Sequence, residues 1–311
     1  MNMIGEKSIR RDAMKHIFLC LLVILMLLAL VGCGHHNAQE KATFDHKMKI
    51  VEQKEKAYYN ELEAAHLEQL KSINRNDAIE DNKALFEKKN ETMQHTLEPK
   101  FNAYKKAANQ LPANNHELDT LKTTYMEAVK KKEHALKQIE AFLSLYLQTI
   151  ESNENIVAHT QKFDALRSKV ERNLMASKAT QNGNNESEQL EETLINQNAH
   201  IKRVATNVLE EKDGRQQSES IKSEVVPVIE QNVKTLNQLR INDANVNKAR
   251  QNAIQMNYAL EDFYKERAQS ATYSHRLSKI NIKQIVKTPE ELEAYEAKYN
   301  EKNDEIESKL Q

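Results

Sequence analysis

The four residues Leu30-Val31-Gly32-Cys33 carry the most specific chemistry in the chain. A cysteine thiolate is a soft nucleophile, and it can be alkylated to a thioether on a diacylglycerol carrier. The small side chain of Gly32 would let a peptidase reach the backbone, so that cleavage makes Cys33 the new N-terminus. This pattern predicts a lipoprotein signal that is cleaved between Gly32 and Cys33, with Cys33 as a diacylglyceryl cysteine that also carries palmitate.

The residues before Cys33 have the order that such a signal needs. Basic side chains come first, at Lys7, Arg10, Arg11 and Lys15. An unbroken apolar run of 15 residues follows, from Ile17 to Val31. A membrane-spanning helix needs roughly 20 residues, so the run favours a cleaved signal over the alternative, an uncleaved signal anchor. Met14 would make a second good translation start.

Two acyl chains are enough for stable membrane anchoring. We therefore expect residues 1–32 to be a signal peptide, and the rest of the chain to be lipid-anchored at the extracytoplasmic face of the cell membrane. Residues 33–42 show no helical period, and we interpret them as a flexible tether. The adjacent histidines His35 and His36 could touch a metal ion, but in a loose polar segment they are expected to be solvated.

Composition excludes several classes of function. The whole chain has a formal charge of -1 and the leader contributes +2, from four basic residues against Glu6 and Asp12, which leaves -3 for the remainder. Such a chain is not drawn to nucleic acid. Only two glycines follow Gly34, namely Gly183 and Gly214, whereas enzymes with phosphate loops and tight turns usually need more. We find no catalytic motif, and expect no enzyme activity, cofactor or metal site.

Apolar residues from Phe44 onward recur at spacings of three and four, which is typical of amphipathic helices. Polar residues such as Glu55 and Asn242 interrupt these narrow stripes. The pattern predicts an all-α fold of elongated antiparallel helical hairpins, similar to a coiled-coil bundle. We expect one helical domain at 43–176, a linker at 177–189 and a second helical region at 190–311.

Several local signals refine this prediction. Residues 111–115 contain Pro112 and an Asn pair, which predict a hairpin loop. Pro99 lies within a continuous stripe, so we expect a kink rather than a helix end. A second polar break is expected at 212–220, a new start at Pro227, and then one long helix over 233–285. Thr288, with Pro289 and Glu291 after it, predicts the capped start of a last helix.

Two groups of residues have both a structural and a functional interpretation. Four tyrosines lie on the apolar stripes, where we expect core positions first and sugar-stacking platforms only second: Tyr58, Tyr104, Tyr125 and Tyr146. The run Lys130-Lys131-Lys132 could contact the phosphates of teichoic acid, although a charge run on a helix is usually a solvated face.

The lipobox, the stretch Glu55-Lys56-Ala57-Tyr58-Tyr59 and the segment Tyr125-Met126-Glu127-Ala128-Val129-Lys130 together resemble the YkyA-like lipoproteins of Gram-positive bacteria. That resemblance covers residues 33–176 and implies a long helical, cell-wall-binding lipoprotein. The Glu-x-x-Tyr-Tyr stretch is also similar to a set of lipoproteins named for an EMYY motif, although Lys56 and Ala57 depart from that motif.

The leading hypothesis is a surface lipoprotein whose helical ectodomain acts as a spacer or binding module in the cell envelope. Its partners would be the membrane, through the lipid, and either peptidoglycan and teichoic acid or an envelope protein. The alternative is an accessory subunit of a membrane-associated secretion or wall-assembly complex, because long seams with polar interruptions are what partner helices can complete.

Overall fold

The computed structural model describes residues 37–72, 82–179, 181–211, 213–285 and 288–310. Within these ranges the chain forms helices and short connections, and none of these residues lies in a β-strand, which confirms the predicted all-α class. Contacts divide the chain into two compact units. Unit 1 comprises the described residues up to Leu67, with 92–136 and 288–310, and unit 2 comprises those of 68–91 and 137–285.

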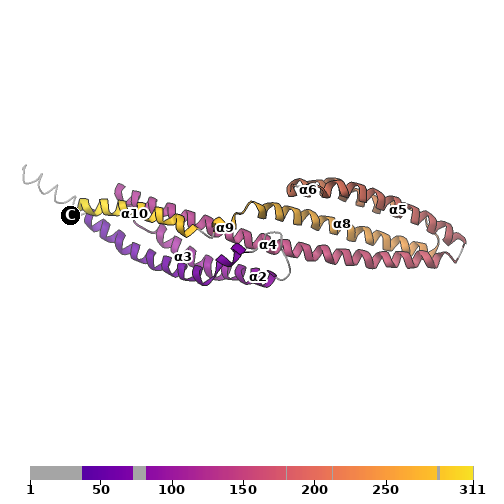
Figure 1. Cartoon of the computed structure of the whole chain (residues 1–311), viewed down its shortest axis with the longest axis horizontal. Coiled ribbons are helices and arrows are strands. Elements are labelled where there is room, and N and C mark those ends of the chain that lie inside the picture. Colours follow the sequence, from indigo (N-terminus) through magenta and orange to yellow (C-terminus); the bar gives the residue numbers. More distant parts are fainter. Residues whose placement is uncertain (1–36, 73–81, 180, 212, 286–287, 311) are drawn as a thin grey trace, which may run out of the picture. The chain divides into compact units, whose positions relative to one another are not determined.

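Four helical segments build unit 1: residues 37–64, α3 (Glu98–Asn109), the first part of α4 (His116–Ser177) and α10 (Thr288–Leu310). Figure 1 shows α10 beside the first helix, and a 3.3 Å ion pair between Lys41 and Glu307 joins the two. Aromatic rings from all four segments meet in the core, with neighbouring centroids 5.3 to 6.4 Å apart: Tyr58, Phe101, Tyr104, Tyr125 and Tyr299. Such edge and offset contacts add to the stability gained from burial.

Unit 2 contains the remainder of α4 and the helices that follow it: α5 (Gln181–Leu209), α6 (Gly214–Ser220), α7 (Val226–Gln238), α8 (Ala244–Ser278) and α9 (Ile282–Ile285). Before them come the 3₁₀ turn η1 (Leu67–Ser72) and α2 (Lys83–Thr92). Phe86 of α2 stacks on Tyr146 of α4 at 3.7 Å between centroids and covers Phe142. Phe142 and Tyr146 are both fully buried by this packing.

Pro99 and Pro227 each follow a π-helical turn. Turn η3 (Met93–Leu97) precedes Pro99, and turn η4 (Ile221–Val225) precedes Pro227. A proline ring clashes with the carbonyl four residues earlier in an α-helix, and here that carbonyl lies inside the widened turn. The helix therefore continues through Pro99, as predicted. Helix α7 begins at Val226, one residue before the predicted start at Pro227, and it follows η4 without a break in the helical backbone.

Side-chain caps define the connections of both units. The predicted hairpin at 111–115 is present: the side chain of Asn115 accepts from the backbone N–H of Leu118, and Lys122 Nζ donates to the carbonyls of Asn109 and Leu111. In unit 2, Asp213 and Asp243 cap α6 and α8 by accepting from backbone N–H groups. These caps satisfy helix-end groups that would otherwise lack partners.

Three predicted irregular segments are more helical than expected. Residues 37–42 of the predicted tether belong to the first helix, where Lys41 pairs with Asp45 at 2.6 Å. Helix α5 begins at Gln181, inside the predicted linker, because Gly183 and Ser187 pack into the core. The polar break at 212–220 is also shorter than predicted, because Asp213 starts α6 at once.

Two longer predictions differ from the structure as well. The expected single helix over 233–285 is interrupted after α7, where Leu239 is extended and Asp243 caps a new helix. Helix α8 itself ends at Ser278, before α9, and so stops short of the predicted end at residue 285. Contacts also group the helices differently from the sequence-based division: α10 packs in unit 1, where Lys302 Nζ donates to Thr124 of α4 at 3.0 Å. Helix α10 begins at Thr288 as expected, although the side chains of its predicted cap lie outside the described residues.

Candidate functional site

The predicted lipidation and cleavage residues, Cys33 and Gly32, lie outside the described residues, as do His35 and His36. Their assignment therefore stays a prediction from sequence. Among the residues that the structure does describe, no group of three or more histidine, cysteine or carboxylate side chains could hold a metal ion. No helix within the described ranges is both long enough and apolar enough to cross a membrane.

The core of unit 1 contains a charged cluster built on Glu55. Its carboxylate accepts hydrogen bonds from the hydroxyls of Tyr125 (2.9 Å) and Tyr104 (3.1 Å), and it forms an ion pair with Lys132 Nζ. The ammonium group of Lys132 also lies over the rings of Tyr59 and Tyr104, at 4.9 and 5.4 Å from their centroids. The two ends of the stretch on which a family resemblance rested, Glu55 and Tyr59, are therefore part of one polar network.

The network changes the acid–base behaviour of its members. Burial raises the pKa of Tyr104 and of Tyr125, and the neighbouring Glu55 carboxylate raises both further. Burial on its own would lower the pKa of Lys132, but attraction to Glu55 and the hydrogen bonds that Lys132 donates to Glu55 and Tyr59 outweigh it, so this pKa is raised. At neutral pH both tyrosines therefore stay protonated and Lys132 stays charged.

These positions decide between the alternatives left open by sequence. Tyr58, Tyr104, Tyr125 and Tyr146 are all buried, which confirms them as core residues and removes them as exposed platforms for sugars. Of the three lysines, Lys132 is buried against Glu55 and Lys131 lies 4.4 Å above the ring of Tyr295. Only Lys130 and Lys131 of the run are exposed, so the run presents two charges at the surface rather than three.

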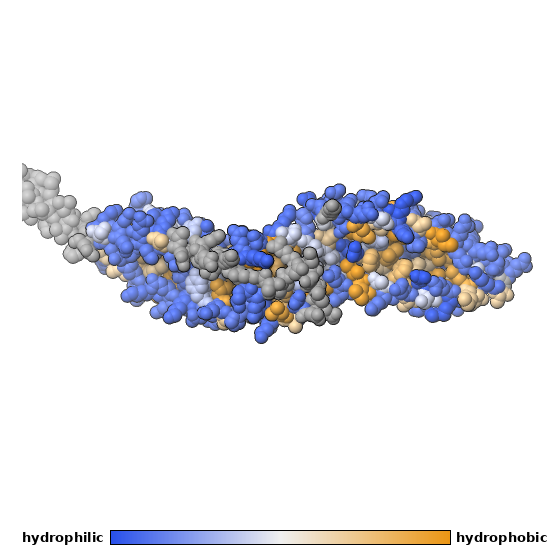
Figure 2. Space-filling model, in the orientation of Figure 1, coloured by the Kyte–Doolittle hydropathy of each residue, from blue (hydrophilic) through white to orange (hydrophobic). Residues whose placement is uncertain are grey.

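Unit 2 carries an apolar groove of about 710 Å³ between α4 and α5, with α8 contributing to its lining. Phe163, Leu174 and Met175 line it from α4, and Leu194 and Ile195 line it from α5. Met175 and Ile195 are 78% and 68% exposed, which is unusual for large apolar side chains. Figure 2 shows hydrophobic surface gathered on this unit. A ligand in the groove could bury this exposed apolar area.

The groove forms because α4 and α5 share a core only near their connection. A core cluster close to that connection includes Val170 and Leu174 of α4 together with Leu190 of α5. The next cluster along α5 is formed by α5, η4, α7 and α8, and it contains no residue of α4. A smaller hollow of about 270 Å³ continues in this direction, from Phe163 to Leu209 and Tyr264.

The sequence offered a weak signal for this groove. Met175 follows the stripe residue Leu174, and Ile195 follows Leu194. Each adjacent apolar residue widens its stripe beyond the width needed to contact one neighbouring helix. The groove was nevertheless missed, because its position depends on where α4 leaves the shared core.

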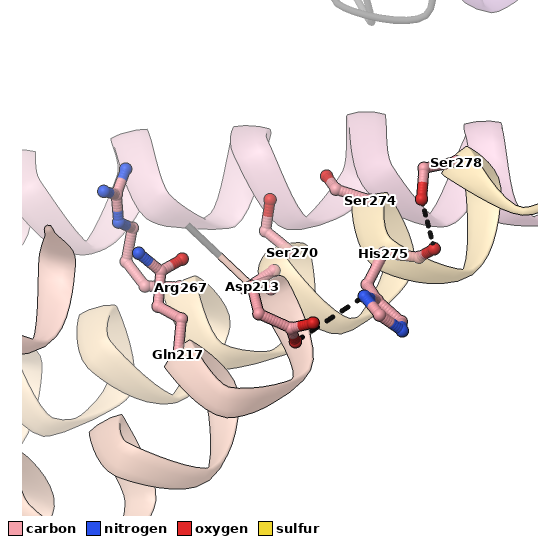
Figure 3. A pocket seen from close by; sticks show the side chains of 9 residues that line it. Asp213, Gln217, Arg267, Ser270, Ser274, His275 and Ser278 are labelled. Atoms are coloured by element: carbon pink, nitrogen blue, oxygen red, sulfur yellow. Dashed lines mark hydrogen bonds and ion pairs between the residues drawn. The ribbon is translucent and has the colours of Figure 1, made fainter. Parts of the chain in front are cut away.

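A second hollow of unit 2 is polar (Figure 3) and lies between α6 and α8. Asp213 faces the imidazole of His275, with 3.7 Å between Oδ1 and Nδ1, and three serines of α8 line the same hollow. A Ser-His-Asp arrangement would need a serine directed to the other imidazole nitrogen. Instead, Ser278 donates to the backbone carbonyl of His275, and Asp213 accepts from the N–H groups of Gln216 and Arg215, which lower its pKa. The acid here is a helix cap.

The apolar groove is therefore the best candidate for a binding site in the described part of the chain. Comparison with known proteins adds the family: a family model described as EMYY-motif containing lipoprotein matches residues 14–307. No curated protein and no solved structure gave a match to the chain. The resemblance to YkyA-like lipoproteins stays a prediction.

Proposed function

Because this chain belongs to the family of EMYY-motif containing lipoproteins, we propose that it is a non-catalytic binding module of the cell envelope. A lipid on Cys33 holds it at the extracytoplasmic face of the membrane. Its helical ectodomain contacts another envelope component through the groove of unit 2. The observation that carries this proposal is the open, apolar groove with two highly exposed large side chains, Met175 and Ile195.

The anchor is tested by Cys33→Ala in the full chain. A thiol is needed to form the thioether, so the variant is expected to accumulate as an unprocessed precursor or to leave the membrane fraction. The matched control is Cys20→Ala, which removes the other cysteine, inside the apolar run. Fully processed, membrane-retained protein from the Cys33 variant would overturn the lipoprotein assignment for this residue.

The binding role is tested by the lateral mobility of the fluorescently labelled lipoprotein in cells. A protein that is only anchored diffuses as its lipid does, whereas one that binds an envelope component moves more slowly. Ile195→Glu places a charge in the groove and is expected to raise the diffusion coefficient. Val157→Glu is the matched control, because Val157 is a 55% exposed apolar residue of α4 outside the groove lining. Equal mobility of all three proteins would contradict the proposal.

The cell wall is the first envelope component to test, by co-sedimentation of the lipoprotein with purified sacculi. The buried tyrosines and the buried Lys132 do not favour contacts through those residues. Saturable binding that Ile195→Glu abolishes would support a wall ligand in the groove. Binding that needs teichoic acid and is lost in salt would indicate a charged surface elsewhere.

The alternative role is an accessory subunit of a membrane-associated secretion or wall-assembly complex. The groove favours this alternative specifically, because a channel between two helices is the kind of surface that a helix of another subunit can fill. In that case slow diffusion would depend on the groove but persist after removal of the wall.

A further inference from the structure

The groove and the smaller hollow beside it form one channel along α5. They share the lining residues Phe163, Asn198, Ile201 and Leu260, and together extend from Glu191 to Leu209 on α5. At about 1.5 Å per residue, this distance is about 27 Å, the length of a helix of about 18 residues. We propose that the channel binds one amphipathic helix of a partner protein, which deepens the proposed function and rests on it.

The charges along the channel favour a helix over an anionic lipid or polymer. Arg167 pairs with Glu171 at 3.0 Å, and Lys178 pairs with Glu191 at 3.1 Å, so these four charges largely cancel. A polyanion would be attracted by an excess of positive charge, and here only Lys202 adds to the balance. These charged residues of the channel lining are complemented by a helix that has mixed charges beside its apolar face, including an acidic residue opposite Lys202.

The floor of the channel also selects against a hydrocarbon chain. Amide side chains interrupt its apolar surface, at Gln197, Asn198 and Asn257. Of these amides only Asn198 is exposed, and an acyl chain would cover it without offering a hydrogen-bond partner, which is costly for a polar group. A helix can present a polar side chain at such a point while its apolar residues fill the remainder.

A second copy of this chain does not fit the channel. The exposed large apolar residues in the described part of the chain are Ile50, Val157, Met175, Ile195 and Tyr258. Met175 and Ile195 line the channel, and the other three lie on three different helices. No described helix therefore presents an apolar stripe that could enter the channel of another copy, which leaves a different protein as the source of the helix.

The test places a photo-crosslinking amino acid, p-benzoylphenylalanine, at Met175 or Ile195 in the full lipoprotein in living cells. The control position is Val157. Mass spectrometry then identifies the peptides attached to each position. We expect the adducts from Met175 and Ile195 to map to one segment of one protein, with apolar residues spaced three and four apart. We expect at least a tenfold lower yield from Val157.

A charge in the channel provides the second readout. Ile195→Glu should lower the yield from the Met175 position at least tenfold, whereas Val157→Glu should leave it unchanged. Adducts on a second copy of this chain, on lipid or on wall fragments would overturn the proposal, and so would equal yields from Val157 or no adducts at all. If mobility in cells still depends on the groove, only the helical partner is wrong. If it does not, the proposed function fails as well.

Discussion

The carboxylate of Glu55 and the ammonium group of Lys132 form an ion pair inside unit 1, where their side chains are only 17% and 4% exposed. The pair joins the first helix to α4, and two tyrosine hydroxyls also donate hydrogen bonds to the carboxylate. Two charges are costly to remove from water, but breaking such a pair costs more because one charge is left buried alone. The geometry makes the two residues mutually dependent.

This dependence gives a first prediction. Glu55→Gln and Lys132→Met should each lower the free energy of unfolding by about 3 kcal/mol, because each leaves a buried group without its partner. The double variant should lose clearly less than the sum of the two losses. Urea denaturation of the four proteins measures this coupling. Lys130→Met is the exposed control and should change stability by less than about 0.5 kcal/mol. Additive losses would show that the two side chains act independently.

The same cluster predicts a loss of stability in alkali. The pKa values of Lys132, Tyr104 and Tyr125 are raised in the folded protein. Their contribution to the free energy of unfolding is therefore fully present below the pKa values of the unfolded chain, which are about 10 to 10.5. It is lost as the pH rises through the pKa values of the folded protein. Stability should be flat from about pH 7 to 9 and fall above pH 10. The chain has no tryptophan, so tyrosinate absorbance reports the titration directly. Titration of all ten tyrosines at their ordinary pKa in the native protein would contradict this.

Gly214 is a position where no larger residue fits. A Cβ atom there would lie 2.6 Å from the backbone carbonyl oxygen of Ala271, so α6 and α8 would have to separate. Gly214→Ala should therefore destabilise the protein by about 1 to 3 kcal/mol, although alanine is the better helix former. Thermal unfolding measures the effect. Arg215→Ala, at a 75% exposed neighbour, is the control and should be nearly neutral.

Gln197 and Asn232 are a weak point in the core of unit 2. Gln197 Nε2 donates to the carbonyl of Asn232 at 3.2 Å, while Gln197 Oε1 and Asn232 Nδ2 are buried without a hydrogen-bond partner. Gln197→Met keeps the size of the side chain and removes one of these unsatisfied atoms. We expect it to raise stability by about 1 kcal/mol, which denaturant unfolding would detect. Gln197→Ala leaves a cavity instead and should destabilise.

The stability of unit 2 depends on the ionised carboxylate of Glu186, and therefore on pH in the acidic range. Its carboxylate accepts from the backbone N–H groups of Asp243 (2.8 Å) and Asn242 (3.0 Å), and these bonds lower its pKa below 4.5. The stability that Glu186 contributes is present above pH 4.5 and is lost as the pH falls through the lower pKa of the folded protein. Glu186→Gln should thus be less stable than the wild type at pH 7, and the difference should shrink toward about pH 3. Glu192→Gln, at an exposed position of α5, removes one carboxylate as the matched control and should leave stability at pH 7 nearly unchanged.

The sequence predicted the parts of this fold that depend on local periodicity. The apolar stripes identified most of the core, and Pro112 with its following asparagines identified the first hairpin. What it missed depends on distant contacts: Glu186 lies 56 residues before the loop that it caps, and that loop divides a stripe that looks continuous. Likewise, Glu55 resembles an interruption of its stripe until Lys132 is placed beside it. The groove could not be found from one stripe, because three helices define it.

The two π-helical turns have a consequence for comparing relatives. Buried residues are seven apart on either side of η3, from Phe86 to Met93 and from Phe101 to Ala108, but eight apart across it, from Met93 to Phe101. Ile221 and Ile229 show the same spacing of eight across η4. Because a π turn encloses one residue more than an α turn, each behaves as a single-residue insertion. Relatives without Pro99 or Pro227 are expected to be one residue shorter at that point, and aligning them without this gap would turn core positions outward.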